Sequence, residues 1–256
     1  MQRLGLKRAF WRACYNRLAK KFPIPEITLM NYGFIDSEHI SLTDNEEPNR
    51  YSLHLYHHVV SGLSLSGKKV VEVGSDRGGG AAYLASHFGP EILWGVDLSV
   101  DAVNWCKQFH TQSNLCFMEA DAEDLPFEDR AIDVVVNIES SHCYPSRPRF
   151  FAEVHRILSH GGYLAWADMI TPAEWTWLIP QLRGMGFSTS VEQEITPNVL
   201  QALRAIGDTR TNFIHAHVPR YLHTLFCTFA GMPGTLIYKR LEKGQLQYKR
   251  VLLRKL

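Results

Sequence analysis

The sequence predicts a doubly wound α/β fold, in which a mostly parallel sheet carries helices on both faces. From Lys68 onward, short runs rich in β-branched residues alternate with amphipathic stretches, as in parallel strands joined by crossover helices. The run at 132–138 is almost entirely apolar, as expected of a central strand covered on both faces. A glycine-rich turn at 74–80 links the first run to the first amphipathic stretch, the position where such folds bind ligands.

Each element follows from a local pattern. Strands are predicted at 68–73, 92–96, 115–119, 132–138 and 163–168, and two further strands at 187–195 and 246–254. Helices are predicted at 78–87, 100–109, 148–158 and 171–185, with Pro180 limiting the regularity of the last. Residues 159–162 are expected to stop the third of these helices before the fifth strand begins.

Two segments lie outside this alternation. Residues 1–66 are predicted to form a helical N-terminal extension to a main domain at 67–256, and residues 196–244 interrupt its last two strands. The interruption carries many aromatic and imidazole side chains at helix-compatible spacing. We expect a helical lid there, because open α/β sheets bind ligands beyond the carboxyl ends of their strands. The alternative is a set of helices that only extend the core.

Composition excludes several classes of protein. Hydrophobic residues make up 45% of the 256, enough for a sizeable core rather than disorder, and a net charge of +1 gives no sign of a nucleic-acid partner. The five cysteines are scattered without a C-x-x-C pair, which argues against a zinc knuckle and favours a reducing, cytoplasmic setting. The sequence lacks an apolar run long enough for a membrane span and the apolar core of a secretory signal.

Acidic residues follow the two strands after the glycine turn. Asp97 ends the second strand, 23 residues after Gly74, where a carboxylate can accept hydrogen bonds from both hydroxyls of a ribose. Asp121 and Ala122 follow the third strand, where a carboxylate can accept a hydrogen bond from an exocyclic adenine amine. With the exposed amides of the glycine turn, these strand ends predict one nucleoside site. The alternative is that both are ordinary turn aspartates.

Several stretches together resemble the motif set of class I S-adenosylmethionine-dependent methyltransferases, in the usual order. They read VVEVGSDRGGG, GVDLS, EADAEDLPF, VVNIESSHCYP and ILSHGGYLAWADM. The strings MNYGF, NRYSLHLYHHV and MPGTLIYKRLEKGQLQYK further resemble bacterial O-methyltransferases of the phthiotriol and phenolphthiotriol dimycocerosate type and their sugar and natural-product relatives. The resemblance spans residues 30–256 and implies a Rossmann-like, seven-stranded sheet. It also implies S-adenosylmethionine as cofactor and, as substrate, a hydroxyl of a hydrophobic or glycosylated small molecule.

The resemblance also implies which residues hold the cofactor. Tyr32, Arg50 and Tyr56 are expected to close over it from the N-terminal segment, with packing roles as the alternative. The full predicted set is Tyr32, Arg50, Glu72, Gly74, Ser75, Asp97, Leu98, Asp121, Ala122 and Asn137.

One position departs from the family pattern. The loop of this subgroup reads GCGRGGG, whereas Asp76 here replaces the middle glycine. That position often needs a positive φ, which Asp tolerates better than most residues. Its carboxylate is expected to repel the carboxylate of the cofactor's methionine moiety. We therefore expect cofactor binding with altered affinity, and the alternative is a chain that binds cofactor poorly or has lost activity.

His142 is the predicted general base. It follows the fourth strand at the carboxyl edge of the sheet, and an imidazole with an ordinary pKa of about 6.5 suits base catalysis near neutrality. Asp168 ends the adjacent fifth strand, where it can orient the ring. A similar pair is proposed as a catalytic dyad in related sugar O-methyltransferases. The alternatives are a loop histidine and a helix-capping aspartate, and no metal is predicted because no metal-binding histidine motif is present.

The N-terminus is strongly basic. Residues 1–25 contain seven basic residues and no acidic one, with Trp11, Tyr15, Leu18 and Phe22 at helical spacing. This pattern predicts a basic amphipathic helix, with peripheral membrane contact, docking on the domain or a transit peptide as the alternatives. Residues 26–238, by contrast, carry 25 acidic residues against 13 basic ones.

These observations predict an S-adenosylmethionine-dependent O-methyltransferase that methylates a lipid, polyketide or glycosylated small molecule by in-line transfer. A noncatalytic module that binds a membrane or partner through its basic helix is the alternative from another class. A nicotinamide-dependent dehydrogenase is less favoured, because the sequence lacks a G-x-G-x-x-G fingerprint.

Overall fold

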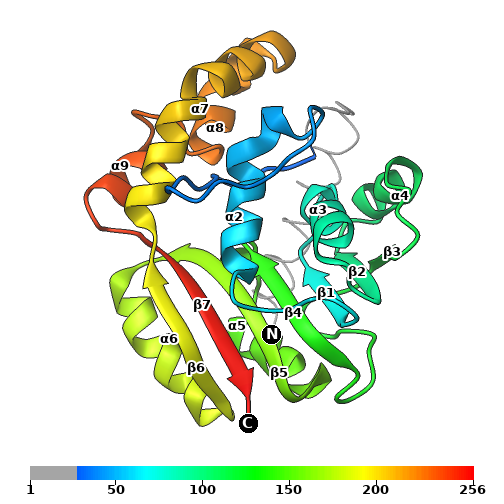
Figure 1. Cartoon of the computed structure of the whole chain (residues 1–256). Helices are drawn as coiled ribbons and strands as arrows, with labels where there is room; N and C mark the ends of the chain where they lie inside the picture. Colours follow the sequence, from blue (N-terminus) through cyan, green and yellow to red (C-terminus); the bar gives the residue numbers. More distant parts are fainter. Residues whose placement is uncertain (1–27) are drawn as a thin grey trace.

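A computed structural model describes residues 28–256, and Figure 1 shows their arrangement. Seven strands form one sheet in the order β3-β2-β1-β4-β5-β7-β6. Their bounds are β1 Lys69–Val73, β2 Ile92–Asp97, β3 Leu115–Glu119, β4 Ile132–Ile138, β5 Leu158–Ile170, β6 Phe187–Glu194 and β7 Gln247–Lys255. Neighbouring strands run parallel except that β7 is antiparallel to β5 and β6. The predicted mostly parallel, doubly wound sheet is confirmed.

Helices cover both faces of this sheet. Their bounds are η1 Glu47–Asn49, α2 Arg50–Val60, α3 Gly79–Phe88, α4 Val100–Phe109, η2 Ser141–Cys143, α5 Arg147–Ile157, α6 Pro172–Gly184, α7 Thr196–His217, η3 Arg220–Leu222, α8 His223–Phe229 and α9 Leu236–Glu242. Val70 of β1 packs in a core with side chains of α2 and α3, whereas its neighbour Val71 packs with those of α5 and α6. Burial on both faces is the reason why the central strands are so apolar.

The start of β5 differs from the prediction. The expected stop at 159–162 does not separate the helix from the strand, because β5 begins at Leu158, directly after α5. Ile132 pairs with Leu158 and Val134 pairs with Tyr163, so the intervening residues form an irregularity in the ladder. Gly161, with φ +78, supplies the left-handed backbone conformation within that irregularity.

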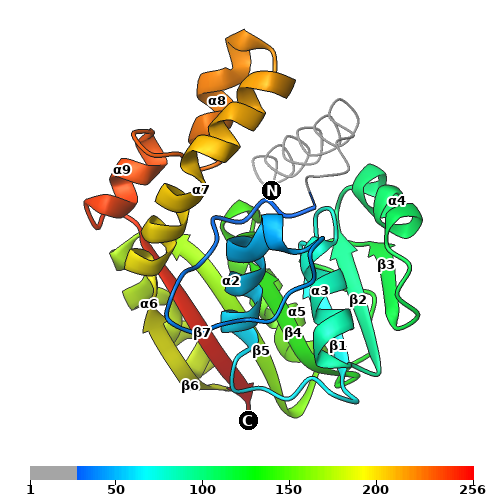
Figure 2. The same cartoon turned by 45° about the horizontal axis from the view of Figure 1, so that its top comes forward.

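The segment between β6 and β7 forms a helical layer at one end of the sheet. Figure 2 shows α7 and α8 rising beyond the sheet, with α9 leading back to β7. No helix within residues 28–256 is long and apolar enough to cross a bilayer. The amphipathic helix predicted at 1–25 lies outside the described residues.

Candidate active site

The tight turn between β1 and α3 requires glycine at position 74. Gly74 has φ +80, and a Cβ atom on it would lie 2.5 Å from the Ser140 hydroxyl oxygen and 2.9 Å from that of Tyr144. The amides of Gly74 and Ser75 both donate to the Val96 carbonyl, at 2.8 and 3.0 Å, which holds the turn against β2. A bound molecule can therefore approach the backbone closely here.

Asp76 takes the left-handed conformation expected at its position, with φ +46. Its amide donates to Asp97 Oδ2 at 2.9 Å, while its own Oδ2 is buried without a hydrogen-bond partner in the described structure. Burial and the neighbouring Asp97 carboxylate raise the pKa of Asp76 to about 7, although the charge of Arg77 opposes the shift. The loop thus contains a carboxyl group that can exchange a proton near neutrality.

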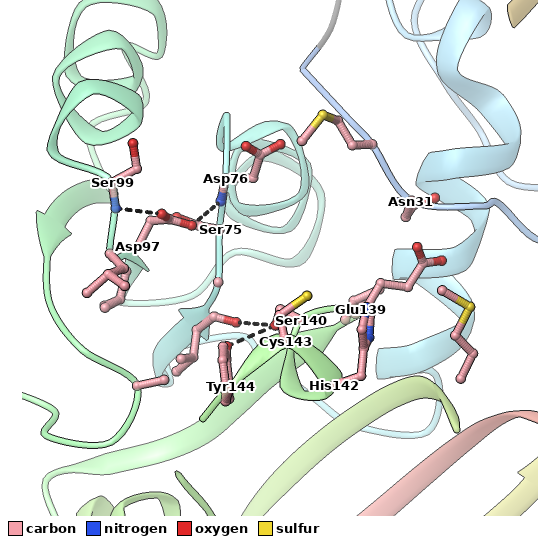
Figure 3. A pocket seen from close by; sticks show the side chains of 18 of the residues that line it. Asn31, Ser75, Asp76, Asp97, Ser99, Glu139, Ser140, His142, Cys143 and Tyr144 are labelled. Carbon is pink, nitrogen blue, oxygen red and sulfur yellow. Dashed lines mark hydrogen bonds between the residues drawn. The ribbon is translucent and has the colours of Figure 1, made fainter. Parts of the chain in front are cut away.

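The strand ends surround a cavity of about 410 Å³, seen from close by in Figure 3. Asp97 stands at its edge, where its Oδ1 accepts a hydrogen bond from the Ser99 amide at 2.8 Å. Most of the predicted cofactor residues line this cavity: Tyr32, Gly74, Ser75, Asp97, Leu98, Asp121 and Ala122. The fold therefore brings the predicted nucleoside-binding positions to one place.

Three predicted cofactor residues do not line the cavity. Arg50 pairs with Glu47, and its guanidinium donates to the Ile40 carbonyl at 3.1 Å, so these contacts hold its side chain outside the cavity lining. Glu72 and Asn137 lie one layer below the lining and support it. Glu72 accepts a hydrogen bond of 2.5 Å from the Tyr56 hydroxyl, and Asn137 Nδ2 donates to Ser140 Oγ at 2.7 Å.

The structure brings His142 and Asp168 together. His142 stands in η2, and its Nδ1 lies 2.6 Å from Oδ1 of Asp168 on β5. The buried carboxylate of Asp168 also accepts hydrogen bonds from the His142 amide at 3.0 Å and from the Ser141 hydroxyl. Trp166 Nε1 in turn donates to Ser141 Oγ at 3.1 Å. The imidazole therefore has a fixed orientation, and its side chain, 30% exposed, lines the cavity.

Electrostatics define the protonation of this pair. Burial alone lowers the pKa of His142, but the charge of Asp168 and its hydrogen bond outweigh this effect, so the pKa lies well above the ordinary value. Burial raises the pKa of Asp168, and His142 together with the Ser141 hydroxyl reverses the shift to below the ordinary value. Asp168 is therefore an ionised acceptor for the Nδ1 proton. This leaves Nε2 as the ring nitrogen available to a ligand.

Comparison with known proteins identifies the family. A family model described as a methyltransferase domain matches residues 71–166. The phthiotriol/phenolphthiotriol dimycocerosates methyltransferase of Mycobacterium leprae (strain TN) is 35% identical over 244 residues, which cover 93% of this chain and 89% of that protein. The chain belongs to the class I S-adenosylmethionine-dependent methyltransferases. The noncatalytic alternative is thereby disfavoured, because the likeness to enzymes covers nearly the whole methyltransferase.

Two further proteins show the range of this similarity. The fatty-acid O-methyltransferase of Mycolicibacterium smegmatis (strain ATCC 700084 / mc(2)155) is 40% identical over 156 residues, 60% of this methyltransferase and 57% of that protein. A geranyl diphosphate methyltransferase, solved in complex with GPP and sinefungin, superposes with a TM-score of 0.69 at 17% identity, covering 98% of this chain and all of that one. The second likeness shows the fold alone.

The cavity of the methyltransferase fits S-adenosylmethionine, the cofactor of the family. The turn at Gly74 leaves room where a side chain would collide, and the buried hydroxyl of Ser75 lacks a partner in the described structure. The carboxyl groups of Asp76, Asp97 and Asp121 line the cavity. A nearby cation favours the ionised form of a carboxyl group, so these acidic surroundings suit a sulfonium.

Glu139 is a cavity residue that the sequence reasoning missed. It follows β4 with φ +50, and its Oε1 accepts hydrogen bonds of 2.8 Å from the Tyr32 amide and from the Tyr248 hydroxyl. Burial raises its pKa to about 7, against these two hydrogen bonds. The sequence contains a signal for Glu139, because it is an acidic residue directly after a central strand. Asp97 was identified by the same criterion.

Proposed function

We propose that this methyltransferase methylates a hydroxyl of a hydrophobic lipid, polyketide or glycosylated small molecule, with His142 as general base. The observation that carries the proposal is the contact of 2.6 Å between His142 Nδ1 and Asp168 Oδ1, in the cavity that Asp97 also lines. An alcohol is a weak nucleophile, and a general base in reach of its proton adds roughly 10²- to 10⁴-fold to the rate.

Each member of the pair has a defined task. Nε2 of His142 accepts the hydroxyl proton as the new C–O bond forms. Asp168 accepts the hydrogen bond from Nδ1–H, aims Nε2 and stabilises the imidazolium that results. S-adenosylmethionine, when bound, supplies an electrophilic methyl group. The positive charge of a sulfonium lowers the pKa of a nearby imidazole, which offsets the elevation caused by Asp168.

The remaining assignments concern binding. We assign the ribose hydroxyls to Asp97, the adenine to Asp121 and Ala122, and the methionine end to Gly74 and Ser75. Leu98 and Tyr32 are assigned to the walls of the same site. The segment 196–244 acts as the lid, because Phe229 and Ile237 from it line the cavity.

Apolar side chains of the cavity support this substrate class. Those that line it include Cys143, Met169, Phe229, Ile237 and Leu246. Curated relatives are named for a phthiotriol lipid and for a fatty acid, which supports an apolar methyl acceptor.

The test measures the rate at which the purified protein transfers a labelled methyl group from S-adenosylmethionine to long-chain alcohols. His142→Ala should lower the rate at least about tenfold and leave cofactor affinity, measured by calorimetry, near that of the wild type. Asn198→Ala, which removes a hydrogen bond of 2.7 Å to the Ile35 carbonyl away from the cavity, is the matched control. An unchanged rate in His142→Ala removes this residue from the mechanism.

A further inference from the structure

An apolar stripe runs along η3 and α8. The two helices are continuous, so Tyr221, Leu225 and Phe229, spaced four residues apart, lie on one face. Their exposed fractions are 82%, 63% and 39%, and Leu236 at the start of the adjoining α9 is 67% exposed. We call these four residues the lid stripe.

The lid stripe differs from the rest of the described surface. Its members are four of the eight large hydrophobic side chains exposed within residues 28–256. No residue of α8 is fully buried, and only Cys227 of this helix packs against the protein core. A monomer rarely gathers exposed apolar side chains in this way unless the patch contacts another phase or molecule.

The lid stripe is continuous with the active-site cavity. Phe229, its innermost member, lines that cavity, and the Phe229 carbonyl accepts a hydrogen bond of 2.9 Å from the Tyr32 hydroxyl. Ile237, which follows Leu236 on α9, lines it as well. The lid stripe therefore ends at the cavity, because Phe229 belongs to both.

Basic residues outnumber acidic ones in the lid segment. Residues 196–244 contain six Arg or Lys residues against two acids, although Arg210 is held by the Asn31 carbonyl and Arg240 lines the cavity. Arg220 and Lys239 are exposed beside the stripe, whereas the next acid along the chain, Glu242, pairs with Arg204 at 3.5 Å. Because residues 26–238 are acidic as a whole, this local excess of basic residues is a property of the lid.

We propose that the lid stripe docks this methyltransferase onto an anionic membrane surface, with Tyr221, Leu225 and Leu236 in the interface and Arg220 and Lys239 at the headgroups. Apolar side chains inserted among headgroups and flanking basic residues are the two contributions that drive interfacial binding. The proposal deepens the proposed function, on whose lipid substrate it rests. A lipid alcohol then enters the cavity at Phe229 directly from the bilayer.

The test is sedimentation of the full chain with vesicles of phosphatidylglycerol and phosphatidylcholine, and with vesicles of phosphatidylcholine alone. The wild type should partition onto the anionic vesicles and weakly onto the neutral ones. The double variant Tyr221→Ser and Leu225→Ser should lower that partition coefficient at least about tenfold. Trp177→Ser on α6 is the matched control, because Trp177 is 56% exposed on a helix that covers the other face of the sheet.

Three outcomes overturn the proposal. They are unchanged partition of the double variant, an equal loss in Trp177→Ser, and a wild-type dimer in size-exclusion chromatography that the double variant abolishes. The first would leave another part of the chain as the membrane contact. The last would assign the lid stripe to a second copy of the protein.

The double variant also separates this proposal from the proposed function. Neither Tyr221 nor Leu225 lines the cavity, so methyl transfer to an alcohol dispersed in detergent should stay near the wild-type rate. Absence of methyl transfer to any alcohol, with vesicle binding intact, refutes the proposed function alone. Methyl transfer with unchanged vesicle binding in the double variant refutes the docking surface alone.

Discussion

The amide of Asp76 donates a hydrogen bond of 2.9 Å to the Asp97 carboxylate. This contact joins two acidic residues that line the cavity, one in the turn after β1 and one at the end of β2. The Ser99 amide donates to the other oxygen of the same carboxylate at 2.8 Å, so two backbone amides fix the orientation of Asp97. Asp76 has a left-handed conformation with φ +46 and a buried Oδ2 that lacks a partner in the described structure. This arrangement makes the stability of the protein dependent on pH.

Asp76→Asn should stabilise the ligand-free protein at pH 8. The pKa of Asp76 is raised from 3.8 to about 7, so the stability that its protonated form contributes is full below about pH 4 and is lost as the pH rises through 7. Asn keeps the tolerance for positive φ and has no charge. We expect a gain on the order of 1–2 kcal/mol in the free energy of unfolding at pH 8 and a smaller gain at pH 5.

Urea unfolding at the two pH values measures this difference. Asp124→Asn, in the turn after β3, is the control for the general effect of removing one acid. An Asp76→Asn gain that is equal at pH 5 and pH 8 would contradict the titration of a buried carboxyl group.

Glu139→Ala should destabilise the protein more than Glu139→Gln. The Tyr32 amide and the Tyr248 hydroxyl both donate to Glu139 Oε1 at 2.8 Å, and truncation leaves both donors unpaired in a largely buried place. Each unpaired group costs about 1–3 kcal/mol. Gln retains a carbonyl oxygen for the same two donors, so thermal unfolding should give a much smaller loss for Gln. Equal losses of thermal stability in the two variants would show that the charge of Glu139, and not its capacity to accept hydrogen bonds, stabilises the protein.

Parts of this site were predictable from the sequence because strand ends follow from periodicity. Asp97 and Asp121 were identified from their places after β2 and β3, and the order of the strands then brings them to one edge. Arg50 was assigned to the cofactor by resemblance alone, and Glu47, three residues earlier, holds its side chain elsewhere. The sequence cannot reveal such local pairing, because it depends on rotamers. Glu139 was not predicted, because its place in the cavity depends on a left-handed backbone conformation and on contacts with Tyr32 and Tyr248 that are distant in the sequence.

Gly74→Ala should impair folding and cofactor binding more than Gly62→Ala. Both glycines have nearly the same positive φ, +80 and +83, so both variants incur backbone strain. A Cβ atom at Gly62 meets nothing within 4 Å, whereas at Gly74 it would lie 2.5 Å from Ser140 Oγ. We expect an extra loss of about 1–3 kcal/mol in Gly74→Ala.

Calorimetry with S-adenosylmethionine completes this comparison. Affinity should fall at least about tenfold in Gly74→Ala, since the methyl group displaces side chains that line the cavity, and should be unchanged in Gly62→Ala. Similar affinities in the two variants would mean that the close approach at Gly74 serves the fold and not the ligand.

The pH dependence of methyl transfer tests the partnership of His142 and Asp168. A general base acts in its neutral form, so the rate should fall as the pH drops below the raised pKa of His142. In Asp168→Asn the charge that raises this pKa is gone, so the acid limb of the profile should move to lower pH by at least about one unit. The maximal rate should also fall roughly tenfold to a hundredfold, because the imidazolium loses its stabilising carboxylate.

Glu139 is another cavity residue whose titration could produce the acid limb, since burial raises its pKa to about 7. The variant Glu139→Gln tests whether it does. If the acid limb moves in Glu139→Gln and stays in place in Asp168→Asn, the titrating base is Glu139 and the assignment of His142 is wrong.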